Sequence, residues 1–163
     1  MSDTTIIPID SIDAYNKMYG FETLHPLVSV VDLAEATKIP NHVTFRYGVY
    51  ALWLKDGIQC ALHYGRQQYD YQDGTIVSFA PGQMVRVDMT GEQLHTPSHT
   101  LGLLFHPDLL FGTPLGKTIG SYHFFDYASA ESLHLSERER RMYTDTLNTI
   151  RFEMEQPVDK HSQ

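Results

Sequence analysis

Apolar and polar residues alternate through the middle of the chain in short runs that turn residues separate. In the strongest run, Val43 to Lys55, each odd position from 43 to 53 is apolar or aromatic, which is typical of a half-buried strand. At about 3.3 Å per residue this run is too long for one flat strand, so we expect Gly48 to bend it. Asp56-Gly57 favours a tight hairpin turn into the next strand. The pattern predicts further strands at 27–33, 58–64, 69–71, 75–79, 84–89 and 99–105.

Helical periodicity appears on either side of this region. Ser11 is expected to cap the first helix, and Gly20 fits the left-handed residue that ends it. Ser136 and Glu139 form a capping box at the start of a longer helix, and Pro157 disfavours helical geometry in the residue before it. We therefore expect helices at 12–19 and 137–155, with helical turns at 107–111 and 114–119.

The order of these elements predicts the fold class. About eight short strands follow one another without an intervening helix, which argues against a parallel sheet and favours a mainly β sandwich or barrel. A short N-terminal helix precedes the barrel and C-terminal helices follow it. The predicted division is a tail at 1–9, a barrel domain at 10–130, and a helix with the start of a linker at 131–163.

The composition fits one globular domain. Of 163 residues, 42% are hydrophobic and 20% are charged. The single cysteine, Cys60, excludes an internal disulfide and indicates a reducing compartment. No basic segment with a following apolar run starts the chain, and no window approaches the ~18 apolar residues of a membrane span. We therefore expect a cytoplasmic protein with no membrane partner.

The formal net charge of the chain is −8. An acidic surface repels the phosphate backbone of a nucleic acid instead of releasing its counterions. This segment by itself is therefore not expected to bind DNA or RNA.

Nine histidines raise the question of a metal site. No two stand at the His-x-His spacing of metal-binding cupin barrels, and no histidine directly follows the Pro81-Gly82 turn. His95 and His99 are four residues apart, but Pro97 between them prevents one helical face from presenting both. We expect no metal, no cofactor and no catalytic residue.

Aromatic and polar residues of the central strands are the candidates for a ligand site. A barrel of about eight strands can hold one small ligand, with aromatic rings against its apolar face and Arg or His at its polar edge. Alternatively the aromatic residues fill the core and Arg46 points to solvent. Arg46 and Tyr50 share one face of a regular strand and Trp53 the other, so all three meet only if a bulge shifts the phase. The candidate ligand-binding residues are Arg46, Tyr50, Trp53, His63, Tyr69 and Tyr71.

The expected helix at 137–155 carries an apolar stripe made of Tyr143, Leu147, Ile150 and Met154. The stripe could pack on the barrel, which is the commoner fate of such a helix face. Its spacing also fits a seam between two helices, so these residues are the candidates for a homodimer contact. Periodicity over about two heptads does not decide between these alternatives.

Three segments carry a resemblance to a known family. Residues 73–83 (DGTIVSFAPGQ) lead from a glycine turn to a Pro-Gly turn, residues 103–110 (LLFHPDLL) end a strand in a Phe-His-Pro-Asp turn, and residues 136–139 (SERE) open a long helix that residues 157–162 follow. In order and spacing, from about Ile12 to Ser162, they resemble the cupin-like sensor domain of AraC-family transcription regulators.

The resemblance implies a cupin-like, jelly-roll barrel that senses a small-molecule effector or forms a homodimer, without catalysis. The DNA-binding domain of such a regulator is expected beyond Gln163, so DNA would be a partner of the full-length protein only. Two alternatives stay open. One is a cupin-type enzyme, either an isomerase or a dioxygenase, and the other is a free-standing ligand-binding protein.

Overall fold

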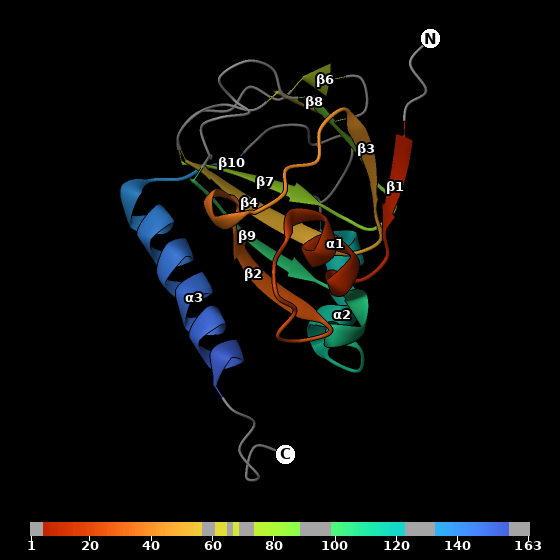
Figure 1. Cartoon of the computed structure of the whole chain (residues 1–163). Coiled ribbons are helices and arrows are strands. Elements are labelled where there is room, and N and C mark those ends of the chain that lie inside the picture. Colours follow the sequence, from red (N-terminus) through yellow and green to blue (C-terminus); the bar gives the residue numbers. More distant parts are fainter. Residues whose placement is uncertain are drawn as a thin grey trace.

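The computed structural model describes residues 5–56, 61–64, 67–68, 74–88, 99–122 and 133–156. These residues form two five-stranded sheets packed face to face, with helices at one side and on one outer face (Figure 1). The first sheet has the order β1-β3-β8-β5-β6 and the second the order β10-β7-β4-β9-β2. The strands of the first sheet are β1 (Thr5–Ile9), β3 (Val43–Tyr47), β8 (Met84–Asp88), β5 (Ala61–Tyr64) and β6 (Gln67–Gln68). Those of the second are β10 (Leu133–His134), β7 (Thr75–Phe79), β4 (Tyr50–Asp56), β9 (His99–Phe105) and β2 (Val28–Asp32).

The main core lies between the two sheets. Successive residues of a strand point to opposite faces, so alternate residues of both sheets meet in the interior. Phe45 of β3 and Val85 of β8 enter from the first sheet, and Trp53 of β4 and Val77 of β7 enter from the second. Burying these large side chains contributes about 1.5–3 kcal/mol each and supplies most of the driving force for folding.

Helix α1 (Ile12–Tyr19) completes this core at one side. The Ser11 side chain accepts a hydrogen bond from the Ala14 amide at 3.0 Å, and Gly20 ends the helix in the left-handed conformation at φ 77°, as the sequence predicted. The inner face of α1 presents Ile12 and Tyr15, which are almost fully buried. The helix therefore packs as part of the sandwich.

The outer face of the second sheet is also apolar, and helices cover it. Helix α3 (Glu137–Glu155) lies along β2 and β9, where Figure 1 shows it in blue beside the sheet. Its predicted capping box of Ser136 and Glu139 is present. A smaller cluster around Tyr50 and Phe105 lies on the same outer face. Short helices complete the fold at η1 (Leu33–Glu35), η3 (Pro107–Leu110), α2 (Pro114–Thr118) and η4 (Ile119–Ser121).

The predicted mainly β fold is right in part. The described strands form two separate sheets, not one closed barrel, and helices contribute a large share of the described residues. No described helix is both long enough and apolar enough to cross a membrane.

The predicted bend at Gly48 is a change of sheet. β3 ends at Tyr47 in the first sheet, and β4 begins at Tyr50 in the second. The Gly48 amide donates to the Ile9 carbonyl at 2.8 Å, and a Cβ at this position would press on the same carbonyl at 2.9 Å. Glycine is therefore required by the close approach of two backbones.

The predicted hairpin through Asp56-Gly57 is wrong. β4 pairs with β7 and β9, whereas β5 pairs with β6 and β8 in the other sheet. Alternating hydrophobicity identifies strands but does not name their partners, because both inner faces of a sandwich are apolar.

The predicted tail at 1–9 is also wrong for its second half. Residues 5–9 are β1, which pairs in parallel with β3, and Ile9 is fully buried. Likewise β10, within the segment 131–163 that was predicted to hold a helix and the start of a linker, pairs with β7. Segments on either side of the predicted boundaries at 9 and 130 therefore share sheets.

Candidate functional site

Three of the six predicted ligand-binding residues, Arg46, Tyr50 and Trp53, have side chains that the structure describes, and these three do not lie together. Arg46 is exposed on the outer face of the first sheet, so it does not line the interior. Its cross-strand neighbours are Pro8 and Met84. The alternative in which Arg46 points to solvent is therefore the right one for this residue.

Tyr50 and Trp53 face opposite sides of the second sheet. The Tyr50 ring stacks on Phe105 with centroids 5.0 Å apart in the outer cluster. Trp53 lies in the main core, 3% exposed, with its ring 5.7 Å from that of Tyr15. The pairing of β4 with β7 and β9 runs residue by residue without a break, so no bulge shifts the phase of this strand. His63 has its backbone in β5, but its side chain, like Tyr69 and Tyr71, lies outside the described residues.

In the described part of the interior, aromatic rings pack against one another. Tyr47 stacks on Phe79 at 5.1 Å, and Tyr15 stacks on Tyr19 at 4.7 Å. Burial raises the pKa of the Tyr47 hydroxyl far above its usual range; nearby Tyr19 also raises it, and a hydrogen bond with Trp53 opposes the rise. These side chains are core residues, as the alternative interpretation of the aromatic pattern held.

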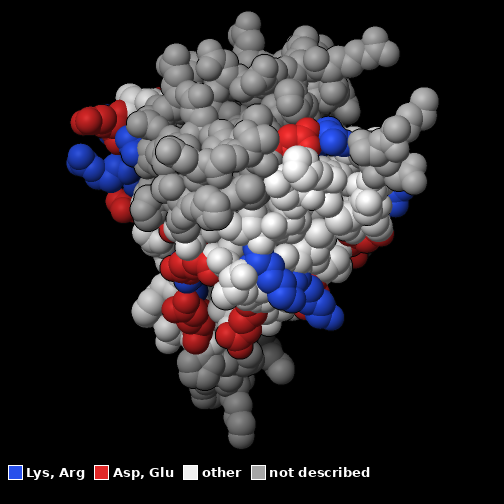
Figure 2. Space-filling view, turned by 45° about the horizontal axis from the view of Figure 1, so that its top comes forward, with Lys and Arg blue, Asp and Glu red and all other residues white. Residues whose placement is uncertain are grey.

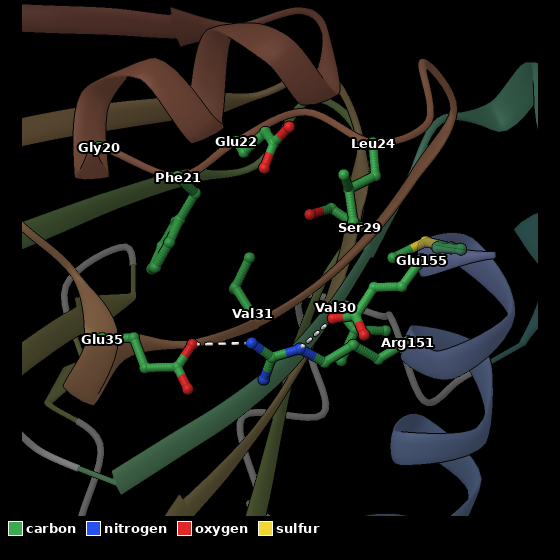
Figure 3. A pocket seen from close by; sticks show the side chains of 11 residues that line it. Gly20, Phe21, Glu22, Leu24, Ser29, Val30, Val31, Glu35, Arg151 and Glu155 are labelled. Carbon is green, nitrogen blue, oxygen red and sulfur yellow. Dashed lines mark hydrogen bonds and ion pairs between the residues drawn. The ribbon is translucent and has the colours of Figure 1, made fainter. Parts of the chain in front are cut away.

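A groove opens instead at the edge of the second sheet, between α1 and α3 (Figure 3). Its volume is about 220 Å³. The segment after α1 forms one wall, β2 the floor, and η1 with the C-terminal turns of α3 the opposite wall. The lining residues are Gly20, Phe21, Glu22, Leu24, Ser29, Val30, Val31, Glu35, Arg151, Met154 and Glu155.

Backbone geometry and a polar network hold the first wall. Gly20 turns the chain out of α1, and a Cβ there would overlap the Thr37 hydroxyl. The buried Asn16 side chain donates to the Thr23 hydroxyl at 3.2 Å and accepts from the Ser29 hydroxyl at 3.4 Å. Thr23 in turn donates to Asp13 at 2.8 Å. The segment 21–24 is thereby tied to both α1 and β2.

Ion pairs close the opposite wall. Arg151 of α3 donates to Glu35 of η1 at 2.9 Å, and its Nε lies 3.4 Å from a carboxylate oxygen of Glu155. The bond to Glu35 is the main reason that the pKa of Arg151 is raised. Figure 3 shows both contacts as dashed lines, with Glu22 on the other side of the groove. No hydrogen bond or ion pair joins the Glu22 carboxylate to another described residue.

The apolar stripe of α3 packs on the chain's own sheet. Leu147 is 2% exposed, and Ile150 and Met154 are half-buried. The Tyr143 hydroxyl donates to the Leu52 carbonyl of β4 at 3.1 Å. In this chain the stripe therefore packs on the second sheet, as the first alternative held.

Among the groove residues, the sequence pattern indicated Met154 as a candidate contact residue and Gly20 only as the end of a helix. The ion pair of Glu35 and Arg151 joins positions 116 residues apart. Neither residue belongs to a motif, so no spacing in the sequence predicts their contact. One signal was available in the sequence: Arg151 directly follows Ile150 of the apolar stripe. A long charged side chain beside such a stripe can reach past the edge of the sheet that the stripe covers.

No family model and no curated protein matches the chain. Among the described side chains, no group of three or more His, Cys, Asp and Glu residues could hold a metal ion.

Proposed function

We propose that the chain is the effector-sensing and dimerisation domain of an AraC-family transcription regulator, with a jelly-roll-like sandwich and no catalytic role. The support is the resemblance of three segments, together with their places in the fold. Gly82 of the Pro-Gly turn has φ 94° between β7 and β8, and His106 caps η3 after β9. The acidic charge of this chain disfavours DNA binding by the chain itself, so DNA would be bound by a further domain of the regulator. The expected place of action is the cytoplasm.

The observation that carries the proposal is the way α3 packs on the second sheet beside the groove. This helix rests on the outer face of the second sheet through one stripe, and its last two turns form a wall of the groove. A ligand in the groove would contact both the sandwich and α3. If α3 has two positions, a ligand in the groove would shift the equilibrium between them. The size of that shift is set by the difference in the ligand's affinity for the two positions.

Dimerisation would use the exposed side of α3, because the stripe is already packed. Met142 and Phe152 are large apolar side chains that are 59% and 60% exposed. Such side chains are enriched at the buried centres of protein interfaces. A two-fold dimer suits a regulator that reads two half-sites.

A fusion tests this function. The chain is joined at its C-terminus to a heterologous monomeric DNA-binding domain, and the affinity for one and for two half-sites is measured. We expect the fusion to bind paired half-sites at least about tenfold more tightly than the DNA-binding domain alone, because the second contact becomes intramolecular.

Two variants locate the contact. The double variant Met142→Glu with Phe152→Glu should lose the tighter binding to paired half-sites, since it places charges on the exposed side of α3. Leu115→Glu, a half-exposed position on α2, is the matched control and should keep it. Equal affinity of fusion and isolated DNA-binding domain for paired sites would overturn the dimerisation role.

A further inference from the structure

The charges around the groove are unbalanced. Three carboxylates, those of Glu22, Glu35 and Glu155, line it with a single guanidinium, that of Arg151. Arg151 is shared between Glu35 and Glu155, whereas Glu22 has no such partner among the described residues. The field inside the groove is therefore negative and attracts a cation.

The remaining lining offers an apolar surface. The Phe21 ring and the Leu24 side chain line the groove on the side of Glu22, and Val30 of β2 lies on the side of Arg151. Met154 of α3 also lines the groove. Leu24 is 46% exposed, which leaves apolar surface uncovered next to a carboxylate. An aromatic face beside a carboxylate also favours an organic cation through the ring quadrupole.

We propose that this groove binds a small organic cation with an apolar body, of the class of arylalkylamines. The ammonium group would lie near Glu22, and the apolar body would cover Phe21, Leu24 and Met154. An anion is disfavoured, because the only cation in the lining already serves two carboxylates. The volume of about 220 Å³ lies below the usual range of drug-sized sites and limits the occupant to a small molecule.

The net charge of the chain agrees with this class of ligand. Acidic side chains gather on the lower left part of the face shown in Figure 2, apart from a group of basic side chains to their right. The chain as a whole carries a net charge of −8, so a cation is attracted at long range as well. The proposal that the groove binds a cation does not depend on the proposed regulatory role. Only the description of the ligand as an effector rests on that role.

The test is a titration of the whole chain with matched probes. 2-Phenylethylamine, its neutral counterpart 2-phenylethanol and the anion phenylacetate are each added while amide chemical shifts are recorded. We expect the amine to bind at least about fivefold more tightly than the alcohol, and its preference to shrink as salt is added. The shifts should concentrate in 20–24, β2 and the end of α3, while phenylacetate causes none there.

Two variants connect the preference to one carboxylate. Glu22→Gln should bring the amine to the affinity of the alcohol, whereas Glu153→Gln, an exposed position on α3 outside the groove, should leave it unchanged. The proposal is overturned if amine and alcohol bind equally, if Glu22→Gln keeps the preference, if the shifts lie elsewhere, or if no probe binds. None of these results bears on the half-site affinity of the fusion.

Discussion

At the scale of single residues, the burial of Trp53 in the core depends on Gly102, its neighbour on the adjacent strand. Gly102 of β9 is paired with Trp53 in the sheet, and the indole ring lies over it. The sequence marked Trp53 as a ligand candidate because an aromatic residue on a strand suits either a pocket or a core. The absence of a side chain at position 102 is what makes room for the ring.

Gly102→Ala should therefore destabilise the protein. A Cβ at this position would overlap the Trp53 ring, and forcing an extra methyl group into a packed core costs about 1–3 kcal/mol. Gly120→Ala is the matched control, because a Cβ there meets nothing within 4 Å. The free energy of unfolding in urea measures both. Equal stability of the two variants would contradict the packing described for Trp53.

Tyr143 gives a second prediction, on pH. Burial raises the pKa of its hydroxyl, so the folded chain keeps this proton while the unfolded chain loses it near pH 10. The unfolded state then binds fewer protons, and stability falls as the pH rises through that value. Tyr143→Phe should cost about 0.5–1.5 kcal/mol at neutral pH and should flatten the fall at alkaline pH.

Urea midpoints at neutral pH and above pH 10 measure this effect, with Tyr122→Phe at an exposed position as the control. A Tyr143→Phe variant with an unchanged alkaline slope would contradict the account. The fall does not vanish in the variant, because burial raises the pKa of Tyr47 as well.

At the scale of elements, the helices followed from the sequence better than the sheets did. Ser11, Gly20, Ser136 and Glu139 act within one turn of their own helix, so their chemistry can be read locally. Strand partners depend on residues far apart, such as Gly48, where a single backbone contact sends the chain into the other sheet. The groove was not predictable for the same reason, since its walls come from the segments after α1 and at the end of α3.

The α3 stripe yields an element-scale prediction. Leu147 is buried against the second sheet, so Leu147→Ala should cost about 2–5 kcal/mol of stability. Met142→Ala, on the exposed side of the same helix, should change stability by about 0.5 kcal/mol or less. Sedimentation velocity of both variants shows whether association changes. If Leu147→Ala dissociates a dimer while leaving the protomer's stability intact, the stripe is an interchain seam and the packing on the sheet is wrong.

At the scale of the whole molecule, the account rests on α3 being a separable element on a stable sandwich. Leu147 is the only fully buried side chain of α3, all of whose residues are described, whereas β4 and β9 are central strands with several buried residues each. Elements with few buried contacts open locally at a lower free energy than the whole protein. Such an opening is what a ligand in the groove would act on.

Native-state hydrogen exchange of the backbone amides tests this claim most directly. The account predicts that amides in the middle of α3 exchange through a local opening at a free energy clearly below that of global unfolding. Amides of β4 and β9 should exchange only when the whole protein unfolds. If α3 and these central strands exchange with the same free energy, then α3 is a fixed part of the core and does not carry a signal.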